Sequence, residues 1–169
     1  DVSRGSGLAL ERARARGALV AGIDASPRLA AIARDRNPSS DIHVGDMHAL
    51  PFDEASFDVV TSFRGVWGTT LAALAEIRRV LVPGGRLGLT VWGHIKASAG
   101  AWALMPFRLA AEEKVDHQAA MVALGRPGVG ESGLAEYGCL YVQPLHVPLP
   151  WGVADPGLVA RPLPSPGPA

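Results

Sequence analysis

The fold of this chain is decided by the stretch Asp1-Val-Ser-Arg-Gly-Ser-Gly7 together with Ala18-Leu-Val-Ala-Gly-Ile-Asp24. The first stretch is typical of a strand end followed by a glycine-containing turn. Residues 8–16 are good helix formers, and Gly17 is a natural helix stop. The second stretch is typical of a parallel strand covered on both faces, and it closes with an acid. This strand–turn–helix–strand order predicts an α/β fold.

Strand and helix signals keep alternating up to Trp92. Ser26 and Pro27 form an N-cap and a first helical position, so a helix is predicted to run to about Arg36. Further strands are expected over 18–23, 42–44, 57–63 and 86–92, with a tight turn at 83–85 before the last. The alternation predicts a doubly wound, Rossmann-like parallel sheet with right-handed crossovers.

A third helix is predicted over 69–81, where apolar residues recur at helical spacing. On the same helix, Glu76, Arg78 and Arg79 are expected to face outward. Beyond residue 93 the pattern weakens: a helix is expected over 99–113, a loop over 126–130, and an edge strand over about 139–149, where Pro144 and Pro148 disfavour a central position.

These signals predict one domain over 1–150, with a core over 1–93, a variable region over 94–138 that contacts the substrate, and the late edge strand. Residues 151–169 are Pro-rich and are predicted to be an irregular tail.

Charge and composition exclude several classes of partner. The 16 basic and 16 acidic residues cancel, so the net charge indicates neither a nucleic-acid nor a membrane-surface partner. The single cysteine, Cys139, excludes an internal disulfide, and the histidines show no metal-binding spacing, so no metal is expected. No apolar run approaches the roughly 20 residues that cross a bilayer. A cytoplasmic protein of unknown oligomeric state is predicted.

The opening unit also predicts a cofactor pocket. Backbone N–H groups of the turn would face the charged part of a ligand, and the Asp24 carboxylate would accept hydrogen bonds from ribose hydroxyls. Two simpler interpretations stay open. Gly5 and Gly7 could serve an ordinary turn, and Asp24 could cap the following helix.

These residues resemble the class I S-adenosylmethionine-dependent methyltransferases, above all the small-molecule group that includes the ubiquinone- and menaquinone-biosynthesis-like enzymes. The resemblance covers roughly residues 1–93. It rests on the joint order of five segments, which are residues 1–7, Gly22-Ile-Asp24-Ala-Ser26, Gly45-Asp46-Met47, Phe57-Asp-Val-Val-Thr-Ser62 and Arg79-Val-Leu-Val-Pro-Gly-Gly-Arg86.

The resemblance implies an enzyme that binds S-adenosyl-L-methionine and methylates a small-molecule acceptor. It implies that Asp24 binds ribose, that Asp46 accepts from the adenine amino group, and that Met47 packs on the adenine ring. The full set of implied cofactor-binding residues is Asp1, Ser3, Gly5, Gly7, Asp24, Ala25, Asp46, Met47, Ser62 and Phe63. No catalytic residue is implied, although His94 has the position of a possible base.

Three residues depart from the family pattern. Ser3 stands where glycine is usual, Arg4 where a small residue or cysteine is common, and Arg64 where asparagine is often found. A Cβ at position 3 intrudes where backbone and cofactor approach closely. The departures keep open a noncatalytic binding module with a degenerate cofactor loop.

An NAD(P)-dependent oxidoreductase is a further alternative, since the fold and the ribose acid serve both cofactors. Its glycine pattern would place Leu10 at the third glycine, and neither tyrosine is followed by lysine four residues later.

The chain is expected to be truncated at both ends. Only Asp1 and Val2 precede the turn, so most of the sheet's first strand is expected to be missing, and a seventh strand is not recognisable. Neighbouring strands would then lack ladder partners, each unpaired group costing roughly 1–3 kcal/mol. Residues 1–169 alone are therefore expected to fold poorly.

Overall fold

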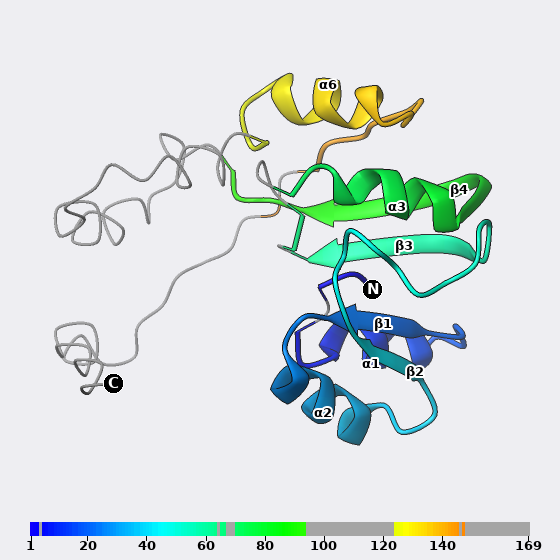
Figure 1. Cartoon of the computed structure of the whole chain (residues 1–169). Coiled ribbons are helices and arrows are strands. Elements are labelled where there is room, and N and C mark those ends of the chain that lie inside the picture. The colour runs from blue at the N-terminus through cyan, green and yellow to red at the C-terminus, as the bar shows by residue number, and fades with distance from the viewer. Residues whose placement is uncertain (4, 64, 67–69, 94–123, 146, 148–169) are drawn as a thin grey trace, which may run out of the picture.

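The computed structural model describes residues 1–3, 5–63, 65–66, 70–93, 124–145 and 147. Their helices and strands are α1 (Leu8–Arg14), β1 (Ala21–Asp24), α2 (Pro27–Arg36), β2 (Asp41–Val44), β3 (Phe57–Phe63), α3 (Ala73–Val80), β4 (Leu81–Thr90) and α6 (Val129–Glu136), shown in Figure 1. The predicted helix over 99–113 and the tail over 151–169 lie outside the described residues.

The strands form two parallel pairs that the N-terminal residues join. β1 pairs with β2, and β3 pairs with β4. Between the pairs, Val2 forms a parallel bridge with Ile23 of β1 and donates its N–H to the carbonyl of Thr61 in β3 at 2.8 Å. The N-terminus accordingly lies between β1 and β3 in Figure 1. The spatial order is β2, β1, Asp1–Val2, β3, β4, which confirms the predicted α/β parallel sheet.

The apolar core has two parts. One cluster contains Val2 and Ile23 with the inner face of α3, and the other joins Leu10 of α1, Ala33 of α2 and Ile42 of β2. Different helices thus cover different apolar surfaces of the strands, as a doubly wound sheet requires.

The local signals that predicted α2 are confirmed. Ser26 is the N-cap, and its Oγ accepts a hydrogen bond from the N–H of Leu29 at 3.3 Å. Pro27 occupies the first helical position, where its missing N–H removes no helical bond. The helix ends at Arg36, as predicted.

Other boundaries differ from the predictions. β1 begins at Ala21 instead of residue 18, and α3 covers only Ala73–Val80 of the predicted 69–81. The turn over 83–85 lies inside β4, because Leu81 already pairs with Phe57 before the register shifts to Val59 and Arg86. Gly84 has φ 78°, a conformation in which glycine is favoured.

The region after residue 123 departs most from the sequence-based expectation. The predicted loop over 126–130 is wrong at its end, because α6 begins at Val129. Leu134 and Tyr137, at the end of this helix, pack against the larger core cluster. The edge strand expected over about 139–149 is not found in residues 139–145 or 147, where Pro144 lacks an N–H for strand pairing.

A small cavity of about 20 Å³ lies beside the N-terminal residues, lined by Asp1, Val2, Ala21, Leu50, Phe52, Phe57, Val59, Val60 and Val80. It therefore lies between the β1 and β3 sides of the sheet. Within the described part of the chain, no helix is long and apolar enough to cross a membrane.

Candidate functional site

The predicted site residues all follow the carboxyl ends of parallel strands or end them. Asp1 and the turn over 3–7 belong to the central segment, and Asp24 with Ala25 ends β1. Asp46 and Met47 follow β2, and Ser62 and Phe63 end β3. Because these strands run parallel, the ten residues share one edge of the sheet, where ligands bind in open α/β folds.

The glycine turn has two functions, one for each glycine. Gly5 has φ 56°, and a Cβ built there would meet no atom of the described residues within 4 Å. Gly7 has φ 79°, and a Cβ there would lie 2.8 Å from Asn37 Nδ2 and 2.9 Å from Ala33 Cβ. Gly7 is therefore needed for packing against α2, whereas Gly5 leaves open space beside the backbone.

Asn37, directly after α2, supports this site although no motif of the sequence pointed to it. It is buried, and its Nδ2 donates to the carbonyls of Gly7 and Ala33, at 3.1 Å each. Asn37 thus fixes the end of α2 to the glycine turn. An asparagine directly before Pro38 was the signal available in the sequence.

Asp24 is buried at 8% exposure and holds the turn in place. Its Oδ2 accepts the N–H of Gly5 at 2.8 Å, and its Oδ1 accepts the N–H of Ser26 at 3.0 Å. Ser26 is the N-cap of α2, so Asp24 supports the start of that helix in addition to binding Gly5. Each carboxylate oxygen can accept two hydrogen bonds, so the Asp24 carboxylate retains acceptor capacity beyond these two bonds.

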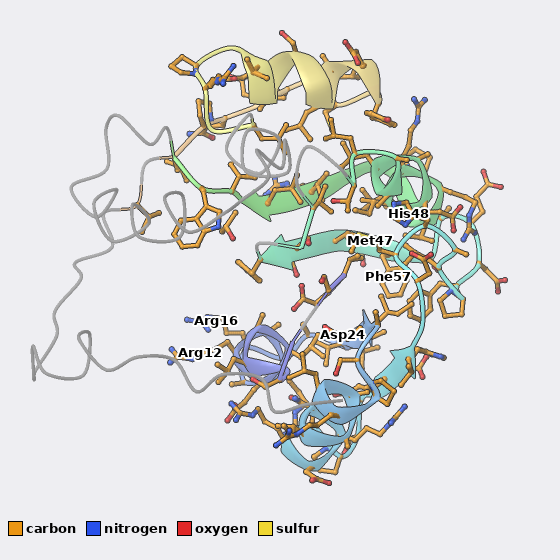
Figure 2. The ribbon with its side chains drawn as sticks, turned by 60° about the vertical axis from the view of Figure 1, so that its left-hand side comes forward. Arg12, Arg16, Asp24, Met47, His48 and Phe57 are labelled. Atoms are coloured by element: carbon orange, nitrogen blue, oxygen red, sulfur yellow. The ribbon has the colours of Figure 1, made fainter. Side chains whose placement is uncertain are left out.

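Asp46 lies on the exposed turn after β2. Its Oδ1 accepts the backbone N–H of His48 at 2.9 Å and lies 2.7 Å from His48 Nδ1. The backbone hydrogen bond from His48, followed by the side-chain one, lowers the pKa of Asp46. Met47 is half-buried and packs against the larger core cluster (Figure 2). The turn therefore presents an ionised acceptor beside a thioether.

Ser3, Ser62 and Gly65 lie together at the end of β3. Ser3 has φ 57°, a left-handed conformation that costs a non-glycine residue about 1–3 kcal/mol. A Cβ built on Gly65 would lie 2.6 Å from Ser62 Oγ and 2.9 Å from Ser3 Oγ. Ser62 is fully buried, and its Oγ has no hydrogen-bond partner among the described residues. Phe63, 48% exposed, is not a core residue.

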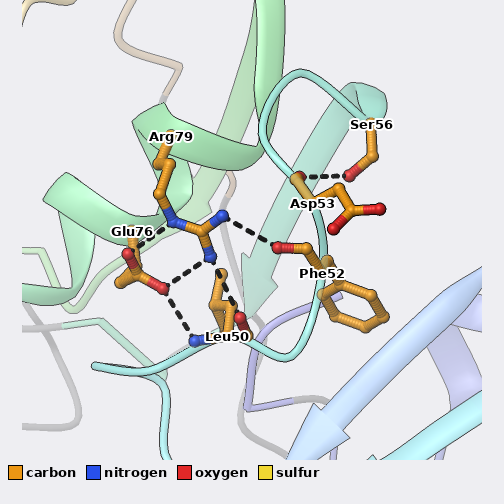
Figure 3. Close-up of polar contacts among 6 residues, drawn as sticks. All are labelled: Leu50, Phe52, Asp53, Ser56, Glu76 and Arg79. Atoms are coloured by element: carbon orange, nitrogen blue, oxygen red, sulfur yellow. Dashed lines mark hydrogen bonds and ion pairs between the residues drawn. The ribbon is translucent and has the colours of Figure 1, made fainter.

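Glu76 and Arg79, which were predicted to face outward from the helix, are both half-buried and make contacts that the prediction did not include. Figure 3 shows both bound to the segment after the Asp46 turn. Arg79 donates to Glu76 at 2.7 and 2.8 Å, to the Phe52 carbonyl at 2.8 Å and to the Leu50 carbonyl at 3.0 Å. Glu76 Oε2 accepts the N–H of Leu50 at 2.8 Å. Arg78 is the exposed member of the three.

Three other residues that the sequence singled out are not placed by the structure. Arg4, Arg64 and His94 lie outside the described residues. In the part of the chain that the structure describes, no group of three or more His, Cys, Asp or Glu side chains could hold a metal ion.

Comparison with known proteins places this geometry in a family. A protein-family model described as a methyltransferase domain matches residues 1–89. The chain belongs to this methyltransferase-domain family, which confirms the resemblance to class I S-adenosylmethionine-dependent methyltransferases.

Particular relatives agree with the family. The chain is 41% identical over 88 residues to a demethylmenaquinone methyltransferase of Chlorobaculum parvum, covering 50% of this chain and 36% of the relative. It is 38% identical over 107 residues to a malonyl-[acyl-carrier protein] O-methyltransferase of Erwinia pyrifoliae, covering 60% and 40%. The chain thus spans well under half the length of these curated relatives.

A solved structure shares the fold. It is a S-adenosylmethionine-dependent methyltransferase from Thermotoga maritima, described as a possible histamine N-methyltransferase. The match has a TM-score of 0.57 at 22% identity and covers 81% of this chain and 61% of the other.

Proposed function

We propose that this chain forms the cofactor-binding part of an enzyme that transfers a methyl group from S-adenosyl-L-methionine to a small-molecule acceptor. The observation that carries the proposal is the hydrogen bond between Gly5 N–H and Asp24 Oδ2, at 2.8 Å. It brings a backbone turn with open space and a buried carboxylate together at the carboxyl edge of a parallel sheet. The family match over residues 1–89 supports the same function.

The residues fit the proposed cofactor. Asp24 has remaining acceptor capacity for ribose hydroxyls, and the space beside Gly5 lets a ligand approach the backbone. Asp46, held ionised by His48, suits an amino-group donor, and Met47 offers a polarizable surface for a flat ring. Asp1, Ser3, Gly7, Ala25, Ser62 and Phe63 complete the proposed binding set.

The cofactor, when bound, supplies an activated methyl on a sulfonium. The contribution of this chain is to align that ligand and to exclude water around its reacting end. In this proposal Ser62 and Phe63, at the end of β3, form a second wall of the cofactor site. We propose no catalytic residue among the described positions. The methyl acceptor and its reacting atom are left open, and the proposal includes a cytoplasmic location.

Calorimetry tests the proposal. S-adenosylhomocysteine, the demethylated product, is titrated into the protein and into Asp24→Ala, with NADH as the competing ligand. Each charge-assisted hydrogen bond contributes on the order of 1.5–3 kcal/mol, so Asp24→Ala should weaken binding at least about tenfold. Asp35→Ala, an exposed carboxylate on α2, is the matched control and should leave affinity unchanged.

Unchanged affinity in Asp24→Ala would refute the ribose role of this carboxylate. Binding of NADH without binding of S-adenosylhomocysteine would refute the methyltransferase proposal and favour the oxidoreductase.

The left-handed conformation of Ser3 favours a second candidate, a noncatalytic module that keeps the scaffold. Its side chain lies between the glycine turn and Gly65, in space that the usual glycine would leave open. The two candidates differ in whether cofactor affinity is retained.

A further inference from the structure

The loop that carries Asp46 and Met47 is tied at both ends. At its start, the N–H of Gly45 donates to the carbonyl of Asp24 at 3.1 Å. At its end, the N–H of Leu50 donates to Glu76 Oε2 at 2.8 Å. Between these ends, Ala49 N–H donates to the Asp46 carbonyl at 3.2 Å. The first tie comes from the ribose side of the proposed site, and the second comes from α3, far away in sequence.

Arg79 strengthens the second tie through the fixed geometry of its guanidinium. It binds both carboxylate oxygens of Glu76 and also the carbonyls of Leu50 and Phe52. The planar guanidinium of Arg79 therefore fixes two things at once: the Glu76 carboxylate, which binds the N–H of Leu50, and the backbone carbonyls of Leu50 and Phe52. A lysine could not reproduce this fork.

Apolar contacts anchor the same segment. Leu50 is buried in the larger core cluster. The Phe52 ring lies edge-on to His43 of β2, at 5.1 Å between centroids, and to Phe57 of β3, at 5.0 Å. The segment after Leu50 is thus fixed against two strands. Because the loop Gly45–Leu50 ends at this segment, the same contacts restrict where the loop can lie.

We propose that Glu76 and Arg79 are positioning residues of the cofactor site, which hold the loop Gly45–Leu50 so that Asp46 and Met47 face the adenine end of the ligand. This inference rests on the proposed function for its ligand. Neither residue touches the ligand in this scheme, and both act through the backbone of Leu50. Hydrogen bonding to Arg79 keeps Glu76 charged over the working pH range, because it lowers the pKa of Glu76 to about 2.

The first test measures the affinity for S-adenosylhomocysteine by calorimetry. Arg79→Met keeps the aliphatic stem and removes the fork, and it should weaken binding about five- to tenfold. Glu76→Gln retains an acceptor for Leu50 and should give a smaller loss. Arg78→Met is the matched control, because it removes the same charge from the same helix. Arg78 is exposed and donates to the Tyr137 carbonyl at 3.4 Å, away from the loop, so affinity should change less than twofold.

A double-mutant cycle separates positioning from general damage. The effect of Arg79→Met should be clearly smaller in an Asp46→Ala background, because one of the two positioned side chains is already gone. The same effect should persist in an Asp24→Ala background. Equal effects in the two backgrounds would overturn the proposal.

Amide hydrogen exchange of the ligand-free protein provides an independent readout. Arg79→Met should speed exchange at His48, Ala49 and Leu50 by at least tenfold and leave Ile23 unchanged. Faster exchange everywhere, or nowhere, would overturn the proposal. If the unsubstituted protein binds no S-adenosylhomocysteine, the proposed function fails, and the exchange pattern still decides whether the pair holds the loop.

Discussion

The N–H of Val2 donates to the carbonyl oxygen of Thr61 at 2.8 Å, so a residue at the start of the chain is the hydrogen-bonded neighbour of β3. On its other side, Asp1 accepts the N–H of Ile23 at 3.1 Å, and its amino group donates to the Ala21 carbonyl at 2.8 Å. Two residues therefore link the two halves of the sheet. A small cavity lies beside these two residues, and Val59 of β3 is 55% exposed.

Adding strand residues before Asp1 should stabilise this chain. An extended apolar segment of four residues joined before Asp1 would add ladder bonds to β1 and β3, each contributing about 0.5–1.5 kcal/mol. We expect the thermal midpoint to rise by about 5 °C or more. A segment of equal length with two prolines, which cannot donate to the ladder, is the control. Equal midpoints for both extensions would contradict the prediction.

Replacing Ser62 should change stability and affinity in opposite directions. Its buried Oγ has no partner among the described residues, so Ser62→Ala removes an unsatisfied group and should raise the free energy of unfolding by about 1 kcal/mol. If the hydroxyl contacts the cofactor, the same change should weaken S-adenosylhomocysteine binding severalfold. Ser40→Ala is the control, because it removes another hydroxyl, on the loop before β2, that has no hydrogen-bond partner in the described part of the chain. Affinity that stays equal in both variants would remove Ser62 from the site.

Glycine at position 3 should improve cofactor binding. Ser3→Gly relieves a backbone at φ 57° and clears the side chain next to Gly65. We expect affinity for S-adenosylhomocysteine to rise severalfold in calorimetry. Ala55→Gly relieves a similar backbone, at φ 51°, outside the site and should leave affinity unchanged. No gain from Ser3→Gly would mean that the turn tolerates serine, and the noncatalytic candidate would lose its support.

Acid should weaken the Glu76–Arg79 pair within a defined range of pH. Hydrogen bonding to Arg79 lowers the pKa of Glu76 from 4.5 to about 2 in the folded protein. Between these two values the unfolded chain binds the proton that the folded chain does not, so the contribution of Glu76 is present above pH 4.5 and is lost as the pH falls toward 2. Denaturant unfolding of Glu76→Gln should therefore show a flatter decline over this range than the unsubstituted protein.

Glu11→Gln provides the control for this experiment. Its ion pair with Arg36, at 3.4 Å, lies on the surface, where such pairs contribute about 0–1 kcal/mol. A decline that is equally steep in Glu76→Gln and the unsubstituted protein would show that this carboxylate does not set the acid sensitivity.

The sequence by itself determined the order of elements and the positions of the predicted site. Three of these features depend only on residues that are close in sequence: the cap at Ser26, the apolar runs of the strands and the glycines of the first turn. Short-range sterics and hydrogen bonds determine them, so they can be predicted from the sequence. Parallel pairing then follows from the alternation of strand and helix, which is why the ten predicted site residues meet at one edge of the sheet.

Only the tertiary structure decided what those residues touch. The partners of Asp24, Asn37 and Arg79 lie 19, 30 and 29 positions away at their longest separations, and no local pattern specifies such pairs. Helical periodicity placed Glu76 and Arg79 on the outer side of α3, but it could not show that the loop after β2 covers that side. Loop paths depend on packing between distant segments such as Phe52 and Phe57, and that packing exists only in the folded chain.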